Sequence, residues 1–380
     1  MTDIEPTVRF LHSADWQLGM TRARLSEEAG NRFVQERMDA VARLGALVRQ
    51  HRAEFVVVAG DVFESNQLSR QTLLRSLDAL RAIPVPVFLL PGNHDPLETS
   101  AILRTPELAE LSHVIVLEND EPVAVPGLRE VEVVGAPWLN KRPGRDLVTT
   151  LCEGLQPASG LRIAVAHGAI REQAPDPTVP ELIQLAHAEA ALTEHRFDYL
   201  ALGDRHSTTA VGSSGRIWYS GTPVVTDFRE TDPNQVLLVD LSRAHCTVTP
   251  IRTSDWTFER RTFDLNGPED LAQLRTWLEA LPNKACSAVR LGLVGTLNLR
   301  DSAELDDLLD SQRERFASLT LSAGRTDLAV VPDALDDAAT ELGGYLKSAW
   351  HELQSAAVTG DAEAEDALRL LYRLNRQVAD

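Results

Sequence analysis

The first part of the chain alternates between two kinds of hydrophobic pattern. Continuous apolar runs bounded by turn residues lie at 8–12, 55–59 and 85–90, and such runs are typical of buried strands. Between them, apolar residues recur three or four positions apart, before residue 55 and again over about 69–81. This order of strand, helix, strand, helix, strand predicts a parallel α/β sheet, because parallel neighbours need a helical crossover.

A short polar loop follows each of these apolar runs. The first loop contains Asp15 and Gln17, the second Asp61, and the third Asn93 and His94. Because the carboxyl ends of parallel strands lie at one edge of an open α/β sheet, we expect these side chains to lie close together. Asp, Asn and Gln offer oxygen ligands to a divalent ion, and His offers a nitrogen or a proton. The pattern therefore predicts a metal site at this edge.

Two later apolar runs, at 161–166 and 197–202, end in loops of the same kind. These loops contribute His167, Asp204, Arg205 and His206. Five strand ends that carry ligand-type residues indicate a site more strongly than any single motif does.

The rest of the chain lacks such a ligand set. Short strand-like segments at 216–219 and 236–241 are predicted to complete a second sheet. From about Trp256 the pattern favours a small α+β domain, and the composition after residue 332 is helical. The later strands are expected at 288–299 and 317–322, and the helices at 268–281 and 302–315. The expected parts of the chain are thus residues 1–252, 253–332 and 333–380.

Composition narrows the class of protein. The 380 residues carry a formal net charge of −19, which argues against binding nucleic acid by bulk electrostatics. A local basic cluster, such as Lys141, Arg142 and Arg145, can still dock a phosphate backbone. The three cysteines lack metal-ligand or redox spacing, and no apolar run approaches the ~20 residues of a membrane span. We expect a cytoplasmic protein with reduced thiols and no membrane contact.

The strand-end residues suffice for two divalent ions that share one carboxylate, with about three or four protein ligands each. Asp61, which lies centrally in the predicted order, is expected to bridge the ions. The ligands would be Asp15, Gln17, Asp61 and His206 for one ion, and Asp61, Asn93, His167 and Asp204 for the other. Such a pair would lower the pKa of a bridging water for in-line attack on phosphorus. His94 would stabilise the transition state or protonate the leaving oxygen.

In their order along the chain, these motifs resemble those of the calcineurin-like metallophosphoesterases. The resemblance covers the first 250 residues and rests on Asp15-Trp16-Gln17, Gly60-Asp61, Gly92-Asn93-His94-Asp95, His167-Gly168 and Gly203-Asp204-Arg205-His206. A narrower resemblance is to SbcD-like DNA repair exonuclease subunits, and it rests on Phe10-Leu11-His12, on Asp61-Val62-Phe63 and on the small following domain with its helical tail.

The resemblance implies a β-sandwich flanked by helices, followed by a small α+β cap domain and a helical C-terminal tail. It also implies two Mn²⁺ ions, with Mg²⁺ as the alternative, DNA as the substrate, a homodimer, and a partner ATPase of the SbcC/Rad50 type that binds the tail. The apolar residues available for that contact are Leu346, Trp350, Leu353, Leu370 and Leu374. Packing of the tail within the chain is the alternative use of this face.

Two positions depart from the family pattern. Gln17 and Asp204 stand where the family usually has histidines, in Asp-x-His and Gly-His-x-His. Both side chains offer oxygen, and Asp204 adds a third carboxylate to Asp15 and Asp61, so a preference for harder ions and a less acidic bridging water are expected. The alternative is that one metal site has decayed and the protein is a scaffold. Because both replacements can still coordinate, retained activity is favoured.

The leading hypothesis is a metal-dependent nuclease subunit that cleaves phosphodiester bonds of DNA, with Arg205, Lys141 and Arg142 on the phosphates. The alternatives are a small-molecule phosphomonoesterase or cyclic-nucleotide phosphodiesterase, and a scaffold for the ATPase. Trp16 and Trp138 could stack on a base or pack in the protein. Other side chains near the loops have structural interpretations: His12 is expected to be satisfied by a neighbour, and Asp95 to orient His94 or cap its turn.

Overall fold

The computed structural model describes residues 7–331, 345–361, 363–364, 366–368 and 370–371. Their contacts divide into two compact units. The first contains the residues up to Ala23 together with Gly30–Trp256, and the second contains Arg24–Ala29 and the residues from Thr257 onward. None of the helices in these described ranges has the length and apolar character needed to cross a bilayer.

The first unit is built on two six-stranded sheets. Their strand orders are β12-β11-β1-β2-β3-β4 and β5-β6-β7-β8-β10-β9. The strands are β1 (Val8–Ser13), β2 (Phe55–Val58), β3 (Val87–Leu89), β4 (Val114–Val116), β5 (Val123–Ala124), β6 (Val131–Ala136), β7 (Leu161–His167), β8 (Tyr199–Gly203), β9 (Thr209–Val211), β10 (Ile217–Tyr219), β11 (Gln235–Leu241) and β12 (Cys246–Arg252). The helices are α1 (Glu27–His51), α2 (Arg70–Arg81), α3 (Pro106–Ala109), α4 (Leu147–Gly154) and α5 (Leu185–Thr193), with short 3-10 turns at Ile102–Arg104 and Arg171–Gln173.

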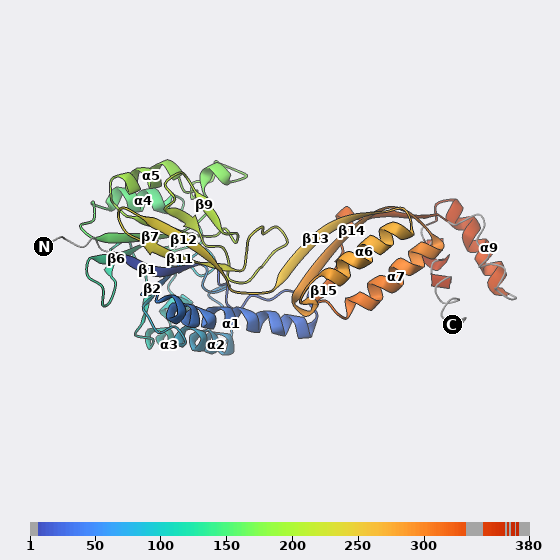
Figure 1. Cartoon of the computed structure of the whole chain (residues 1–380), viewed down its shortest axis with the longest axis horizontal. Coiled ribbons are helices and arrows are strands. Elements are labelled where there is room, and N and C mark those ends of the chain that lie inside the picture. Colours follow the sequence, from blue (N-terminus) through green and yellow to red (C-terminus); the bar gives the residue numbers. More distant parts are fainter. Residues whose placement is uncertain (1–6, 332–344, 362, 365, 369, 372–380) are drawn as a thin grey trace. The chain divides into compact units, whose positions relative to one another are not determined.

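The sheets lie face to face, and helices cover both outer faces. One core, which includes Phe10, Val57 and Ile163, lies between the sheets. A second core joins the first sheet to α1, α2 and α3, and a third joins the second sheet to α4 and α5. Figure 1 shows these two helix groups on opposite sides of the strands. The predicted sandwich flanked by helices is confirmed, and β1, β2 and β3 are adjacent and parallel as the pattern indicated.

One strand assignment was wrong. The segments at 216–219 and 236–241 were expected to lie in the second sheet, and β10 does lie there, parallel to β8. However, β11 lies in the first sheet, antiparallel to β1, with Val8 opposite Leu241. Both faces of β11 are buried, since Leu238 packs under the helices and Val239 packs between the sheets. An apolar run of this kind fits either sheet, so its pattern alone does not select the partner strand.

The second unit contains a wholly parallel sheet. In it β14 pairs with β13, β15 and β16. Its elements are β13 (Thr257–Leu265), α6 (Pro268–Ala280), a 3-10 turn at Lys284–Cys286, β14 (Ser287–Asn298), α7 (Leu299–Arg313), β15 (Ser318–Leu321), a 3-10 turn at Ala323–Arg325, β16 (Asp327–Val331) and α9 (Tyr345–Val358). A leucine-rich core joins this sheet to α6 and α7. The observed order of strands and helices is the predicted one.

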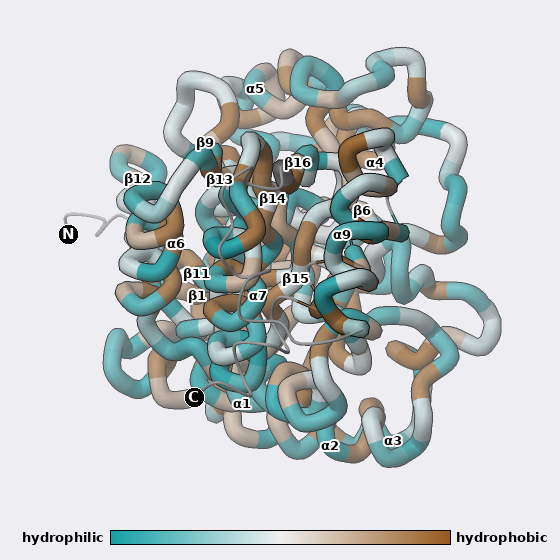
Figure 2. Tube along the Cα trace, turned by 90° about the vertical axis from the view of Figure 1, so that its right-hand side faces the viewer, coloured by the Kyte–Doolittle hydropathy of each residue, from teal (hydrophilic) through white to brown (hydrophobic). Residues whose placement is uncertain are grey.

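Helix α9 packs within the second unit. Trp350 is 1% exposed and contacts a small core that includes Val330 and Leu368, and Leu346 and Leu353 are partly buried against it. The apolar and polar residues of α9 alternate along its tube in Figure 2. The face that was considered for a partner ATPase is therefore used largely inside the unit. Leu370 is exposed, and Leu374 lies outside the described residues.

Candidate metal centre

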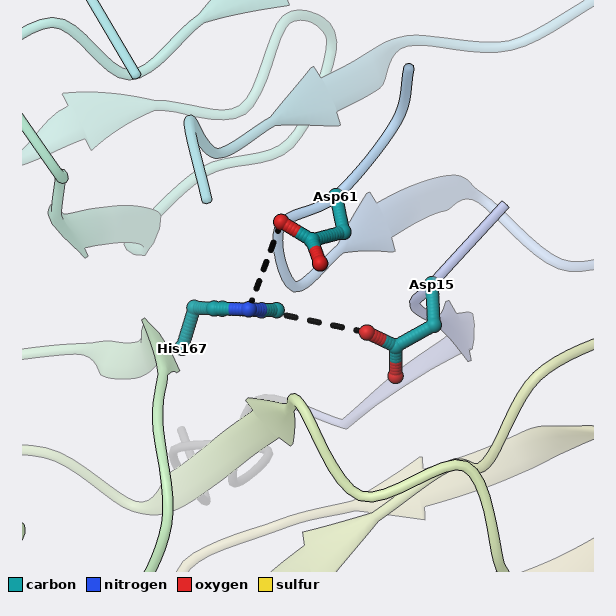
Figure 3. Close-up of side chains that lie close together, drawn as sticks. All are labelled: Asp15, Asp61 and His167. Atoms are coloured by element: carbon teal, nitrogen blue, oxygen red, sulfur yellow. Dashed lines mark ion pairs between the residues drawn. The ribbon is translucent and has the colours of Figure 1, made fainter. Parts of the chain in front are cut away.

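Three strand ends of the first unit bring their polar side chains together. Asp15 follows β1, Asp61 follows β2, and His167 ends β7. Their ligand atoms all lie within 4.8 Å of one another, and the two carboxylates point toward the imidazole ring in Figure 3. The His167 Nε2 atom is 3.4 Å from Asp61 Oδ1, and its Nδ1 atom is 4.0 Å from Asp15 Oδ1. The cluster thus joins the carboxyl ends of strands from both sheets.

The loops that follow β1 and β2 are held in strained conformations. The amide of Asp15 donates to Gly60 O (3.1 Å), and the amide of Gln17 donates to Asp61 O (2.8 Å). Asp15, Gln17, Asp61 and Asp204 all have positive φ, at 54°, 42°, 52° and 92°. Non-glycine residues with positive φ cost energy and persist where the surrounding structure fixes them, which is common at functional sites. Four predicted ligands therefore occupy backbone positions that the fold has to hold in place.

Two glycines allow the loops to approach this closely. A Cβ atom on Gly92 would lie 2.1 Å from Asp61 Oδ1, and one on Gly60 would lie 2.3 Å from His167 Nδ1. Gly60 also has a φ of +89°, which disfavours any side chain. The glycines of both motifs are thus required by the packing of the ligands themselves.

Both histidines are oriented by hydrogen bonds on Nδ1. His167 Nδ1 donates to the carbonyl oxygen of Ala59 (2.8 Å), so Nε2 faces Asn93 Oδ1 at 2.8 Å. His206 Nδ1 lies 2.9 Å from Glu230 Oε1, and its Nε2 lies 4.0 Å from Asp15 Oδ1. Hydrogen bonding of one ring nitrogen to a carboxylate or carbonyl is the usual way in which a metal-binding histidine is fixed.

The electrostatics of the cluster favour a bound cation. Burial, together with Asp61 and Asp204, raises the pKa of Asp15 to about 6. Burial opposes the charge on His167, but Asp61, Asp15 and Asp204 hold its pKa well above the ordinary value. Without metal, a proton on His167 therefore offsets part of the carboxylate charge. The backbone amide of Asp204 adds two hydrogen bonds to the Asp15 carboxylate, at 3.0 and 3.2 Å.

Gln17 gives an independent indication that the residues fit a metal. Its side chain is 3% exposed, and its Oε1 atom is buried without a hydrogen-bond partner among the described residues. A buried acceptor without a partner is costly, so such atoms are rare in folded proteins. An amide oxygen with an unfilled lone pair, beside carboxylates and an oriented imidazole, is a donor set that suits Mn²⁺ or Mg²⁺.

His94 lies beside the cluster and is partly exposed. Its amide donates to Asp61 Oδ1 (3.0 Å), and its Nδ1 donates to the carbonyl oxygen of Glu64 (3.0 Å). Its Nε2 lies 4.0 Å from Asp61 Oδ2, and the side chain is 37% exposed. The Nε2 atom is thus placed where it can exchange a proton with a bound group.

Asp95 holds two of the loops together. It accepts hydrogen bonds from the amides of Gly92 (2.8 Å) and Phe63 (3.0 Å). It therefore caps its own turn and ties that turn to the loop after β2. Of its two expected uses, the structure contains the cap, and burial raises the pKa of this carboxyl to about 7.

The predicted substrate-binding residues lie on exposed loops. Arg205 donates to Gln173 Oε1 (2.8 Å). Lys141 and Arg142 lie on the loop after β6, and the start of that loop is fixed where Trp138 Nε1 donates to His167 O (2.8 Å). The structure thus gathers the expected ligands and His94 at the strand ends, and it leaves the basic residues on the exposed surface.

Two further side chains near the loops are structural. Trp16 is 1% exposed, and its Nε1 donates to Ser13 Oγ, so it packs in the core and is not available to a base. His12 lies between the Tyr199 hydroxyl and the Leu202 carbonyl oxygen, as expected for a histidine satisfied by neighbours. Burial lowers the pKa of His12 to about 3, so this histidine is neutral.

The sequence analysis missed the residues that support the ligands from behind. Glu230 and Thr226 hold His206, and no motif marks them. Arg37 donates to the carbonyl oxygens of Trp16 and Val224. It did carry a signal, because a charged residue four positions from Phe33 lies within the apolar stripe of a predicted helix. Burial lowers the pKa of Arg37 to about 10, so it is charged at neutral pH.

Known proteins that resemble this chain include two bacterial proteins that are named as the D component of the nuclease SbcCD. The protein of Bacillus subtilis (strain 168) is 32% identical over 138 residues, which are 34% of this chain and 33% of that protein. The protein of Rhodobacter capsulatus is 28% identical over 281 residues, or 62% of this chain and 67% of that protein. The chain thus spans a third of the first relative and about two thirds of the second.

A solved structure from Thermus thermophilus is similar to 66% of this chain and 100% of its own, with 11% identity and a TM-score of 0.43. The model of the calcineurin-like phosphoesterase family matches residues 8–245, which include every residue of the cluster. Because this match covers more than half of the sequence, the chain belongs to the calcineurin-like phosphoesterases.

Proposed function

We propose that the chain is a metal-dependent nuclease subunit that hydrolyses phosphodiester bonds of DNA. The observation that carries the proposal is the convergence of Asp15, Asp61 and His167, with the buried, unpartnered amide oxygen of Gln17 beside them. Membership of the phosphoesterase family supports phosphoester hydrolysis, and the names of the two relatives support DNA as the substrate.

Two divalent ions are proposed as cofactors, Mn²⁺ first and Mg²⁺ second. One ion would be held by Asp15, Gln17, Asp61 and His206, and the other by Asp61, Asn93, His167 and Asp204. When bound, such ions polarise a phosphoryl oxygen and make a nucleophile of water at neutral pH. The oxygen ligands Gln17 and Asp204, in place of the family's usual histidines, favour these harder ions.

The chain's own residues position the substrate and move a proton. His94 Nε2 would protonate the leaving oxygen, while the hydrogen bond from Nδ1 to Glu64 O keeps the ring in one orientation. Arg205, Lys141 and Arg142 would contact phosphates on either side of the scissile bond, which gives position without base specificity. This local basic surface would offset the net charge of −19 where DNA approaches.

A partner ATPase of the SbcC/Rad50 type, a homodimer, a cytoplasmic location and a role in DNA repair are part of the same proposal. The relatives' name, a component of SbcCD, supports the ATPase. Trp350 is used inside the second unit, so we propose that the contact uses exposed apolar side chains such as Tyr345, Val358 and Leu370. The capping role of residues 253–332 is likewise proposed.

Hydrolysis of linear and hairpin-ended DNA tests the function, with 4-nitrophenyl phosphate beside it, in Mn²⁺, in Mg²⁺ and in chelator. Asp61→Ala should abolish DNA cleavage. His94→Ala should lower kcat by about 10²- to 10⁴-fold while Mn²⁺ still binds. Asp78→Ala, an exposed carboxylate on α2, is the matched control and should cleave normally.

Turnover of 4-nitrophenyl phosphate without cleavage of DNA would replace the proposal with a phosphomonoesterase. Silence on every substrate, repeated with the ATPase present, would replace it with a scaffold.

A further inference from the structure

Arg37 lies behind the metal centre, in the middle of α1. It is 1% exposed, and its guanidinium lies 5.6 Å from the centre of the Phe33 ring. A charged side chain is rarely buried this fully, because removal of its hydration is costly unless the protein replaces every lost hydrogen bond. What Arg37 binds is therefore informative.

The guanidinium donates to backbone carbonyl oxygens of two loops that are far apart in the sequence. Its Nε and Nη2 atoms donate to Trp16 O at 3.0 and 2.5 Å, and Nη2 also lies 3.3 Å from Asp15 O. Its Nη1 donates to Val224 O at 3.1 Å. Thr222 reinforces the same junction, since its hydroxyl lies 2.9 Å from Asp15 O and 2.9 Å from Val224 O. One planar side chain thus joins the loop after β1 to the loop before β11.

These two loops carry one half of the proposed ligands. Asp15 and Gln17 lie on the first loop, at positive φ, with Trp16 between them. The second loop continues to Thr226 and Glu230, which hold the Nδ1 atom of His206. Strained backbone of this kind persists only where neighbouring groups fix it. Arg37 binds the carbonyl groups of the strained turn itself.

We propose that Arg37 is a positioning residue for the half of the metal centre formed by Asp15, Gln17 and His206. It holds the two loops at the separation at which those three donors converge, and it leaves the half formed by Asn93, His167 and Asp204 unaffected. The inference rests on the proposed function only in that the centre binds metal. It makes no use of DNA or of catalysis.

The geometry explains why arginine is required at this position. A guanidinium presents five donors in a rigid plane, whereas an ammonium is a compact charge on a flexible stem. Lysine at position 37 would keep the charge and lose the simultaneous contact with three carbonyl groups. Arg37→Lys therefore separates positioning from charge.

Calorimetric titration of the full chain with Mn²⁺, without DNA, tests the proposal. Arg37→Lys should weaken one of the two ions by about 10- to 100-fold and leave the other at its wild-type affinity. Its isotherm should match that of Gln17→Met, which removes a donor from the same half, and differ from that of Asn93→Ala. The Mn²⁺ electron paramagnetic resonance spectrum should lose its two-ion signature in step.

Arg162→Lys is the matched control, because it alters an arginine that is also buried and bound to backbone. Its Nη1 donates to Gln156 O and to Arg196 O, both at 2.7 Å, at the start of β7 and away from the ligands. This variant should lower the unfolding temperature and leave both Mn²⁺ affinities unchanged. If Arg37→Lys does not fold, Thr222→Val removes the second link between the same loops and should weaken the same ion to a smaller extent.

Wild-type affinity for both ions in Arg37→Lys, or equal weakening of both ions in Arg37→Lys and Arg162→Lys, would overturn the inference. Wild-type protein that binds two Mn²⁺ ions and leaves DNA intact would overturn the nuclease proposal and leave this inference in place.

Discussion

Both units begin with the same run of elements, and the metal-ligand cluster among the described residues lies in the first. In each, strand, helix, strand, helix and strand form parallel pairs. The difference lies in the connections. In the first unit β1 ends at Ser13 and α1 begins at Glu27, whereas in the second unit β14 ends at Asn298 and α7 begins at Leu299.

The connection decides what a polar residue at a strand end can do. Asn298 directly precedes α7, and its Oδ1 accepts a hydrogen bond from the amide of Asp301 (2.7 Å), so it serves as a helix cap. Asp61 is separated from α2 by a loop, and its carboxylate faces His167. The same strand order thus yields a helix cap where the helix starts at once, and a ligand where a loop intervenes.

The largest effect should come from a single methyl group added to the site. Gly92→Ala places Cβ against Asp61 Oδ1, so we expect Mn²⁺-dependent DNA cleavage to fall by about 10²-fold or more, since small displacements at a reacting centre cost that much. The control is Gly267→Ala in the second unit, where φ is 172° and no atom lies within 4 Å. That variant should change stability by less than about 0.5 kcal/mol. Normal Mn²⁺ binding by Gly92→Ala would contradict the close packing.

Metal should stabilise the two units unequally. At Mn²⁺ concentrations near 100 times Kd, binding to the native state contributes about 2.7 kcal/mol. Hydrogen exchange read by mass spectrometry should therefore slow in the loops after β1, β2 and β7 and stay unchanged in α6 and α7. Equal protection of both units, or none, would contradict a centre confined to the first.

Two buried glutamines sharpen the comparison. Gln17 Oε1 and Gln312 Oε1 are both unpartnered, in the first and second unit respectively. Replacing either with Met removes an unsatisfied acceptor and should stabilise the metal-free protein by about 1 kcal/mol, measured by urea unfolding. Gln17→Met alone should also weaken Mn²⁺ binding, by at least about 10-fold. If Gln17→Met kept full affinity, Gln17 would be no ligand.

Helix caps should behave alike in both units. Ser69 caps α2 and Asn298 caps α7. Each replacement by Ala should cost about 1 kcal/mol in denaturant unfolding and leave Mn²⁺ binding unchanged. A loss of metal affinity in Ser69→Ala, beyond that of Asn298→Ala, would show that α2 acts on the centre.

The sequence predicted those parts of the site that depend on local pattern. Apolar runs that end in Asp15, Asp61 and Asn93 could be recognised because strand, turn and ligand are contiguous, and parallel pairing then brings the ends together. The pairing of β11 with β1 could not be recognised, because a strand buried on both faces carries no sign of its neighbour. The tail was open for the same reason, since Trp350 suits a partner or a core.

The supporting groups were beyond local pattern altogether. Glu230 matters because it meets His206, and Thr222 because it meets Asp15, and in each case the backbone brings together residues with no shared motif. Arg37 was the exception, since its position in an apolar stripe was visible and was not used. A buried charge predicted on a helix next to a site is worth following to its partners.

The bonds that complete the Asp15 loop also set the order in which the protein can be made. Asp15 and Thr222 are 207 positions apart, Asp15 and Asp204 189, and Arg37 and Val224 187. At ribosomal speeds of ~5–20 residues per second, the acidic loop emerges tens of seconds or less before the groups that hold it. During that interval β1 also lacks β11 along one edge. The centre therefore comes into existence only when nearly the whole first unit has been synthesised, so a chain that stops short of β11 exposes an unpaired strand and has no working site.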